Sequence, residues 1–190
     1  INQSEKTQEY VKNGVDESGL VRYIYDDMGR LSDSVVARAE KMKQDVMSEG
    51  KIKINENRLN FIIDLGVPAD NFVTANWSDP EHNILGDIAA WKKIAKDQGQ
   101  TITKGQTSEK ILAYMQNNKG IQIAINGTLG VGAFVSVDQV NALMQRMYGF
   151  TIEADEDVYA VLEKQANGTL KRKSTRFFPE NKFTMYTAAT

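Results

Sequence analysis

Apolar residues recur at helical spacing between residues 32 and 48, on one face formed by Val35, Ala39, Met42 and Val46. Intervals of three and four residues are typical of an amphipathic helix. Ser32 is a candidate N-cap, with Leu31 and Val36 placed as a hydrophobic staple. Gly50 suits the left-handed position after the last turn. We expect Met42 and Val46 to be buried against a sheet that begins at Lys51.

Alternating polar and apolar residues then predict strands over 51–54 and 58–63, joined by a turn at 55–57. A connecting segment follows over 65–76. Asp79-Pro80 resembles an N-cap with proline in the first helical turn, so we predict a helix from there to Gly99. Its apolar face contains Leu85, Ile88, Trp91 and Ala95.

The next segments mix helix and strand signals. We predict a helix over 108–117 with Ile111, Leu112 and Met115 inward, and a strand over 120–125. Ser136 and Gln139 form a candidate capping box for a further helix that Gly149 ends. The inward face of that helix is Val140, Leu143, Met144 and Met147.

The ends of the chain complete the pattern. Residues 19–25 suit either a strand or a short helix. The last forty residues predict strands, with a hairpin at Asn167-Gly168. Because helices and strands are mixed without regular alternation, the predicted class is α+β.

Composition limits the classes of function that the chain can have. A chain of 190 residues with 41% hydrophobic residues suits one domain, or one domain plus a lobe. A net charge of −2 argues against a dedicated nucleic-acid binder. No apolar run approaches eighteen residues, so no membrane span is predicted. The absence of cysteine excludes disulfides and thiolate metal sites.

Catalytic chemistry is not indicated. His82 is the single histidine, and a lone histidine without cysteine does not make a usual zinc site. There is no Gly-x-Ser-x-Gly motif. The acidic run Glu153–Asp157 lacks calcium-loop spacing and is interpreted as a solvated turn. We therefore expect no enzyme activity, no catalytic residue, no cofactor and no metal.

Two segments are candidate interaction sites. The first is a glycine-rich loop after the predicted strand, with Gly127, Thr128, Leu129 and Gly130 as candidate interface residues. It is interpreted as a flexible loop or, as the alternative, a nucleotide-binding loop, although three residues separate it from the Ser136 cap. The second is the basic cluster Lys171, Arg172 and Lys173. It suits contact with nucleic acid or a neighbour's carboxylates, or protection of an exposed strand edge.

An ordered set of motifs resembles the major capsid protein of lambda-type tailed phages, the major capsid protein E family. The set comprises Arg38, Glu40 and Met42 on the helix, Gly50-Lys51-Ile52, Trp77, Asp79-Pro80, Asp87-Ile88 with Gly99, residues 150–152, Tyr159, Asn167-Gly168 and residues 177–183. The resemblance covers about residues 31–186.

The resemblance implies the tailed-phage and herpesvirus capsid shell fold. In that fold a P-domain combines a long spine helix with a sheet, and an A-domain is a compact α/β lobe. Residues 1–30 would be an N-terminal remnant or extended segment, 31–78 part of the P-domain, and 79–149 the A-domain. Residues 150–190 would be returning strands shared by both, and the glycine-rich loop would approach the capsomer axis.

The implied function is that of a structural subunit, prophage-encoded, which self-assembles into hexamers and pentamers around DNA. The implied partners are copies of itself, a scaffolding protein, a portal and packaged DNA bound non-specifically. The implied location is the virion, with assembly in the host cytoplasm. The alternatives are an encapsulin-like shell and a small nucleotide-binding enzyme. Family members have an N-terminal arm, an extended loop and further C-terminal sequence, so we expect this chain to be a fragment that is monomeric or weakly associating alone.

Overall fold

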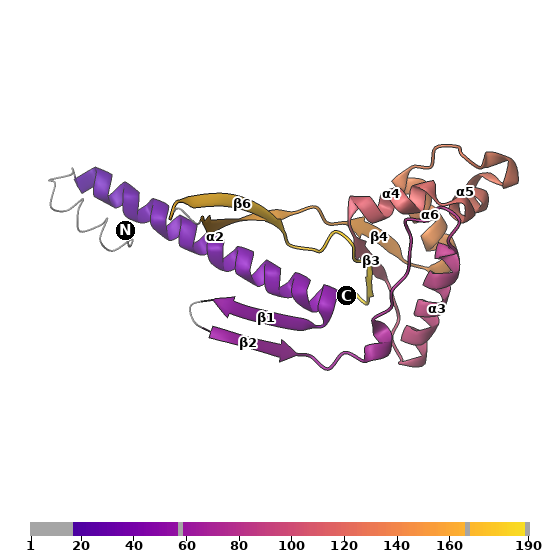
Figure 1. Ribbon diagram of the computed structural model, residues 1–190, viewed down its shortest axis with the longest axis horizontal. Helices are drawn as coiled ribbons and strands as arrows, with labels where there is room; N and C mark the ends of the chain where they lie inside the picture. Colours follow the sequence, from indigo (N-terminus) through magenta and orange to yellow (C-terminus); the bar gives the residue numbers. More distant parts are fainter. Residues whose placement is uncertain (1–16, 57–58, 166–167, 189–190) are drawn as a thin grey trace. The chain divides into compact units, whose positions relative to one another are not determined.

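The computed structural model describes residues 17–56, 59–165 and 168–188, and the chain divides into two compact units, 1–40 and 41–190. The described part of the first unit is helical and belongs to α2, which spans Glu17–Glu49 and ends in the second unit (Figure 1). The helix is longer than predicted, so Leu31, Ser32 and Val36 lie inside it rather than at its start. No proline precedes residue 68, and isolated glycines cost a helix only about 1 kcal/mol each.

The apolar stripe of α2 is only partly covered. Val35 is 69% exposed, and Met42 and Val46 are half-buried, so the predicted burial of the last two is wrong. The fully buried positions of the last turns are Gln44 and Ser48 instead. These two lie four residues apart, and Gln44 is turned inward by hydrogen bonds described below.

The strands after α2 form an isolated ribbon. β1, Lys51–Glu56, pairs antiparallel with β2, Leu59–Asp64, in the register Ile52↔Ile63 and Ile54↔Phe61. This confirms both predicted strands, while residues 57–58 of the turn lie outside the described part. Gly50 has the predicted left-handed backbone, with φ of 66°, and its N–H donates to Val46 at 2.8 Å.

The larger part of the second unit is a lobe of helices on a small sheet (Figure 1). After the short 3-10 turn η1, Ala69–Asn71, its helices are α3, Ile84–Asp97; α4, Glu109–Asn117; α5, Lys119–Asn126; and α6, Val137–Tyr148. The sheet has the order β4–β3–β7, with β3, Lys104–Thr107, parallel to β4, Thr151–Ala154, and antiparallel to β7, Thr184–Tyr186.

Two predictions in the lobe are wrong. The strand expected over 120–125 is helix α5, because the Asn118 side chain accepts from the N–H of Ile121 and caps it. The cap of α3 is Asn83, whereas the Asp79 carboxylate accepts from the Glu81 N–H in the turn before it. Strand β3 was missed because its sequence, Lys-Gly-Gln-Thr, contains no large apolar residue.

Other helix signals are confirmed. Ser108 caps α4, Ser136 and Gln139 form the predicted capping box of α6, and Gly149 ends α6 with φ of 74°. The exception is Met147, which is 48% exposed although it was predicted inward.

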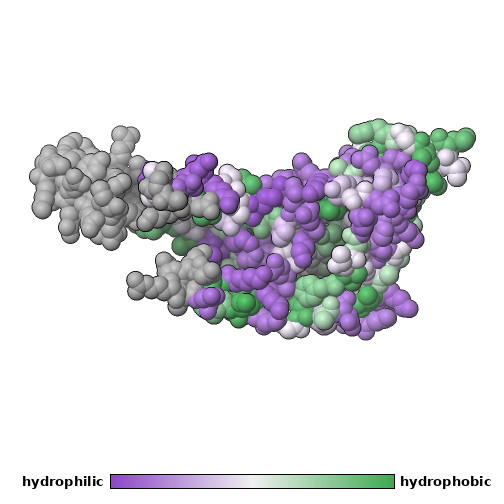
Figure 2. All heavy atoms as spheres, viewed as in Figure 1, coloured by the Kyte–Doolittle hydropathy of each residue, from purple (hydrophilic) through white to green (hydrophobic). Residues whose placement is uncertain are grey.

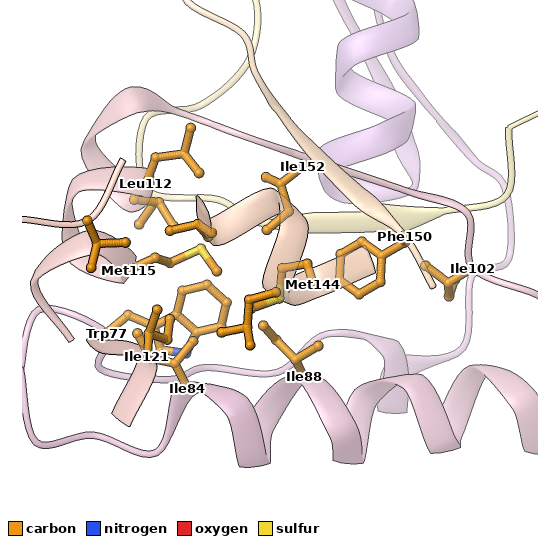
Figure 3. Close-up of a cluster of buried hydrophobic side chains, with 14 residues drawn as sticks. Trp77, Ile84, Ile88, Ile102, Leu112, Met115, Ile121, Met144, Phe150 and Ile152 are labelled. Atoms are coloured by element: carbon orange, nitrogen blue, oxygen red, sulfur yellow. The ribbon is translucent and has the colours of Figure 1, made fainter. Parts of the chain in front are cut away.

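The core of the lobe gathers side chains from its helices and sheet. Met144 and Phe150 lie at its centre, with Ile84, Ile88 and Met115 around them (Figure 3). All five are fully buried, at 0% exposed. At about 1.5–3 kcal/mol for each large side chain removed from water, this cluster is the main stabilising element of the lobe.

A second antiparallel ribbon precedes β7. β5, Val158–Lys164, pairs with β6, Leu170–Arg176, which confirms the predicted hairpin. Gly168 has φ of 84°, and Asn167 lies outside the described residues.

Candidate functional site

The glycine-rich segment forms an exposed loop between α5 and α6. Gly127 ends α5 with φ of 77°, and residues Thr128–Gly130 make the single 3-10 turn η2. Leu129 is fully exposed at 101%, and Phe134 is 84% exposed. Figure 2 shows the apolar surface that this end of the lobe presents. Two large apolar side chains so fully in water are typical of an association surface.

Buried amides brace the base of this loop. The Gln122 side chain is 6% exposed and accepts from the N–H of Gly132 at 2.8 Å. It also donates to the carbonyl of Gln116 at 3.1 Å, and the Gln116 side chain donates to the carbonyl of Val135 at 2.7 Å. The loop is therefore fixed at both ends, which holds its apolar tip outward. The prediction of a simply flexible loop missed these bonds.

The same geometry disfavours phosphate binding. A phosphate loop needs free N–H groups at the start of the following helix. Here the Ser136 hydroxyl accepts from the N–H of Gln139 at 3.2 Å, and the Gln139 side chain accepts from the N–H of Ser136 at 2.9 Å. The segment before the loop is also a helix, α5, rather than the strand that the nucleotide interpretation required.

The predicted basic cluster lies on β6. Lys171, Arg172 and Lys173 are all exposed, and in the ribbon they pair with Glu163, Leu162 and Val161 of β5. Val161 is itself 41% exposed. The structure does not bring this cluster and the loop tip into one site, and each is a separate surface.

A polar cluster joins the end of α2 to the sheet, and sequence analysis missed it. The Gln44 amide donates to an Asp155 oxygen at 2.9 Å, and the Gln106 amide donates to the same oxygen at 2.7 Å and to the Gln44 carbonyl oxygen at 2.9 Å. The other Asp155 oxygen accepts from the N–H of Asp157 at 3.1 Å. Asp155, interpreted from sequence as part of a solvated turn, therefore holds the last turns of α2 against β3 and β4.

The neighbouring carboxylate is also engaged. Glu156 forms an ion pair with Arg176 and accepts from the N–H of Glu109 at 2.8 Å. The hydrogen bond from Arg176, followed by that from Glu109, lowers the pKa of Glu156 below its ordinary value. Together with Asp155, this carboxylate ties the β4–β5 turn to β6 and to the start of α4.

The motif Trp77…Asp87, part of the family resemblance, has a structural role. An Asp87 oxygen accepts from the indole N–H of Trp77 at 2.8 Å and lies 2.7 Å from His82 Nε2. The Trp77 ring stacks on Trp91, with ring centroids 5.4 Å apart. His82 thus completes a packed corner at the start of α3.

Among the described residues, no cluster of three or more His, Cys, Asp or Glu side chains is arranged to hold a metal ion. Within the same residues, none of the helices has the length and apolarity needed to cross a bilayer.

The described residues thus form a mixed helix and sheet fold, with the loop tip and the basic cluster exposed on its surface. The fold is shared with a crystal structure described as that of a prophage capsid protein from E. coli CFT073, at a TM-score of 0.55 and 16% sequence identity. The match covers 90% of this chain and 52% of the other, so the chain spans about half the length of that protein. The two proteins therefore share a fold.

The sequence identifies the family. The family model for phage major capsid protein E matches residues 8–190, and the chain belongs to this family. It is a structural, non-enzymatic family. The family expected from the ordered motifs is thereby confirmed. A comparison with curated proteins gave no match.

Proposed function

We propose that the chain is a subunit of an icosahedral phage capsid, in which copies form hexamers and pentamers that close around DNA. Membership of the capsid family supports this role directly. Closed shells require one subunit to meet identical neighbours through repeated interfaces. The subunit therefore needs surfaces that are apolar, exposed and held in place.

The observation that carries the proposal is the loop tip with Leu129 and Phe134. Both side chains lie in water, although the loop is braced at its base by Gln122. Exposed apolar area of this kind is stabilised when a partner covers it, at roughly 25 cal/mol per Å². We assign the tip, with Gly127, Thr128 and Gly130, to the contact around the capsomer axis.

The basic ribbon is assigned to a second type of contact. Lys171, Arg172 and Lys173 present three cations on one short strand. Such a cluster suits the phosphates of packaged DNA, bound without sequence specificity, and binding of this type weakens as salt rises. A scaffolding protein and a portal complete the partners that capsid assembly in the host cytoplasm implies.

The proposal also assigns the domains. The fold is the tailed-phage capsid shell fold, with α2 as the spine helix of the P-domain. Residues 1–30 are the N-terminal segment, in which α2 begins at Glu17. Residues 31–78 form part of the P-domain, 79–149 the A-domain, and 150–190 the returning strands. The lobe core of α3, α4 and α6 supports a compact A-domain.

Electron microscopy of the complete gene product that contains this sequence tests the proposal. We expect closed, DNA-containing particles, and loss of particles when Leu129 and Phe134 are both changed to Ser. The control is Met147→Ser, which removes an apolar side chain of α6 that is 48% exposed. Assembly of the double variant would refute the role of the loop. The absence of any oligomer from the unchanged protein would refute the capsid function, and empty shells in DNA-rich cells would favour the encapsulin-like alternative.

A further inference from the structure

A groove of about 600 Å³ opens beside β7 in the second unit. Its walls come from the end of α2, the segment after β2, α3 and β7, and their apolar members include Val46, Phe72, Ile94, Ile102 and Met185. This volume is in the range of specific binding pockets. The groove is therefore large enough to receive several apolar side chains.

Two polar features of the groove lack partners in the described structure. β7 is an edge strand, and within the described residues no strand pairs with its outer side. The opposite edge is closed, because the Asn141 side chain pairs with both the N–H and the carbonyl of Ile152. The Ser48 hydroxyl, which lines the groove, is buried and has no hydrogen-bond partner among the described residues. An open strand edge beside a buried hydroxyl suits an extended backbone.

The β1–β2 ribbon carries the complementary surface. The antiparallel register places Ile52, Ile54, Phe61 and Ile63 on one face. Phe61 is 44% exposed and Ile63 is 42% exposed, and neither lines the groove of its own chain. Within the described residues β2 pairs only with β1, so its outer edge is open as well. Open, apolar edge strands are liabilities that proteins usually cover.

We propose that β2 of one copy docks in the groove of a second copy, antiparallel to β7. This rests on the proposed function, since it names the partner surface of a self-assembling subunit. In the proposed register, Ile62 of one copy lies opposite Met185 of the other. Asp64 of the first copy then lies near the start of β7 of the second, where the exposed Lys182 carries the opposite charge. The contact uses different surfaces on the two copies, so each copy keeps one free groove and one free β2 with which further copies can associate.

The absence of cysteine from the 190 residues allows a direct test. One tagged chain carries Asn60→Cys and a second, differently tagged chain carries Thr187→Cys. Both are exposed polar positions, and the proposed register puts them opposite each other. Cross-strand neighbours lie within disulfide reach. The matched control pairs Asn60→Cys with Asn117→Cys on the exposed end of α4.

At high protein concentration we expect at least tenfold more mixed disulfide with Thr187→Cys than with Asn117→Cys, and a several-fold drop when Lys182→Glu is added to the Thr187→Cys chain. Equal yields, or a predominance of Asn60→Cys homodisulfide, would overturn the docking. A copurifying small apolar molecule that fills the groove and prevents cross-linking would also overturn it. If the complete gene product forms shells while the disulfide stays at control level, this inference fails and the capsid function stands.

Discussion

Removal of the Asp155 carboxylate tests the attachment of α2 to the lobe. Asp155→Ala deletes the acceptor of two side-chain amides, Gln44 at 2.9 Å and Gln106 at 2.7 Å. Both of these glutamines are buried, at 2% and 7% exposed. A hydrogen bond to a charged acceptor contributes about 1.5–3 kcal/mol. Because Asp155 is only half-buried, we take the lower end for each bond and expect a loss of about 3 kcal/mol.

Urea unfolding of the 190-residue chain measures this loss. With a denaturant dependence of about 2 kcal/mol/M, the midpoint is expected to fall by about 1.5 M. Hydrogen exchange adds a local readout, because the amides of the last turn of α2 are expected to lose protection first. The control is Glu153→Ala, which removes the exposed partner of Lys104, because an ion pair at the surface contributes little to stability. If Asp155→Ala unfolds like Glu153→Ala and α2 stays protected, the cluster does not anchor the helix.

Three further predictions concern local structure. Gly50→Ala is expected to lower the free energy of unfolding in urea by about 2 kcal/mol, because the φ of Gly50 is 66° and an added Cβ would lie 2.7 Å from Val67 Cγ2. An unchanged urea midpoint would contradict this turn geometry. Ser136→Ala removes one half of the capping box and is expected to cost about 1 kcal/mol in thermal unfolding, whereas Ser136→Asp should retain the cap. The lowered pKa of Glu156 means that its contribution is present above the ordinary glutamate pKa and is lost as pH falls through the folded-state pKa. Glu156→Gln should therefore flatten the acid side of the stability–pH curve, and an unchanged slope would show that the Arg176 pair does not contribute.

Local signals predicted the elements that depend on local chemistry. The capping box at Ser136, the left-handed Gly50 and the helix end at Gly149 are decided within a few residues, so their prediction succeeded. The α5 segment failed because Ile121, Ile123 and Ile125 alternate as in a strand, while the deciding cap, Asn118, lies before the apolar run.

The candidate surfaces show the same division between local signals, which the sequence reveals, and long-range contacts, which it does not. Leu129 was identified because glycines surround it, but its exposure depends on Gln122 and Gln116, whose bonds to the loop form only in the folded lobe. The Asp155 cluster joins residues more than one hundred positions apart along the chain, Gln44 and Asp155 being separated by 111. No spacing of residues along the sequence indicates such a contact, and an acidic run is ordinarily solvated.

Cryo-electron microscopy of particles assembled from the complete gene product tests the central claim most directly. We predict icosahedral particles whose repeated subunit accommodates the lobe of residues 77–186, with the loop around Leu129 at the capsomer axis. Particles built from a different fold, or a protein that remains monomeric under all assembly conditions, would contradict the assignment of this chain as a capsid subunit.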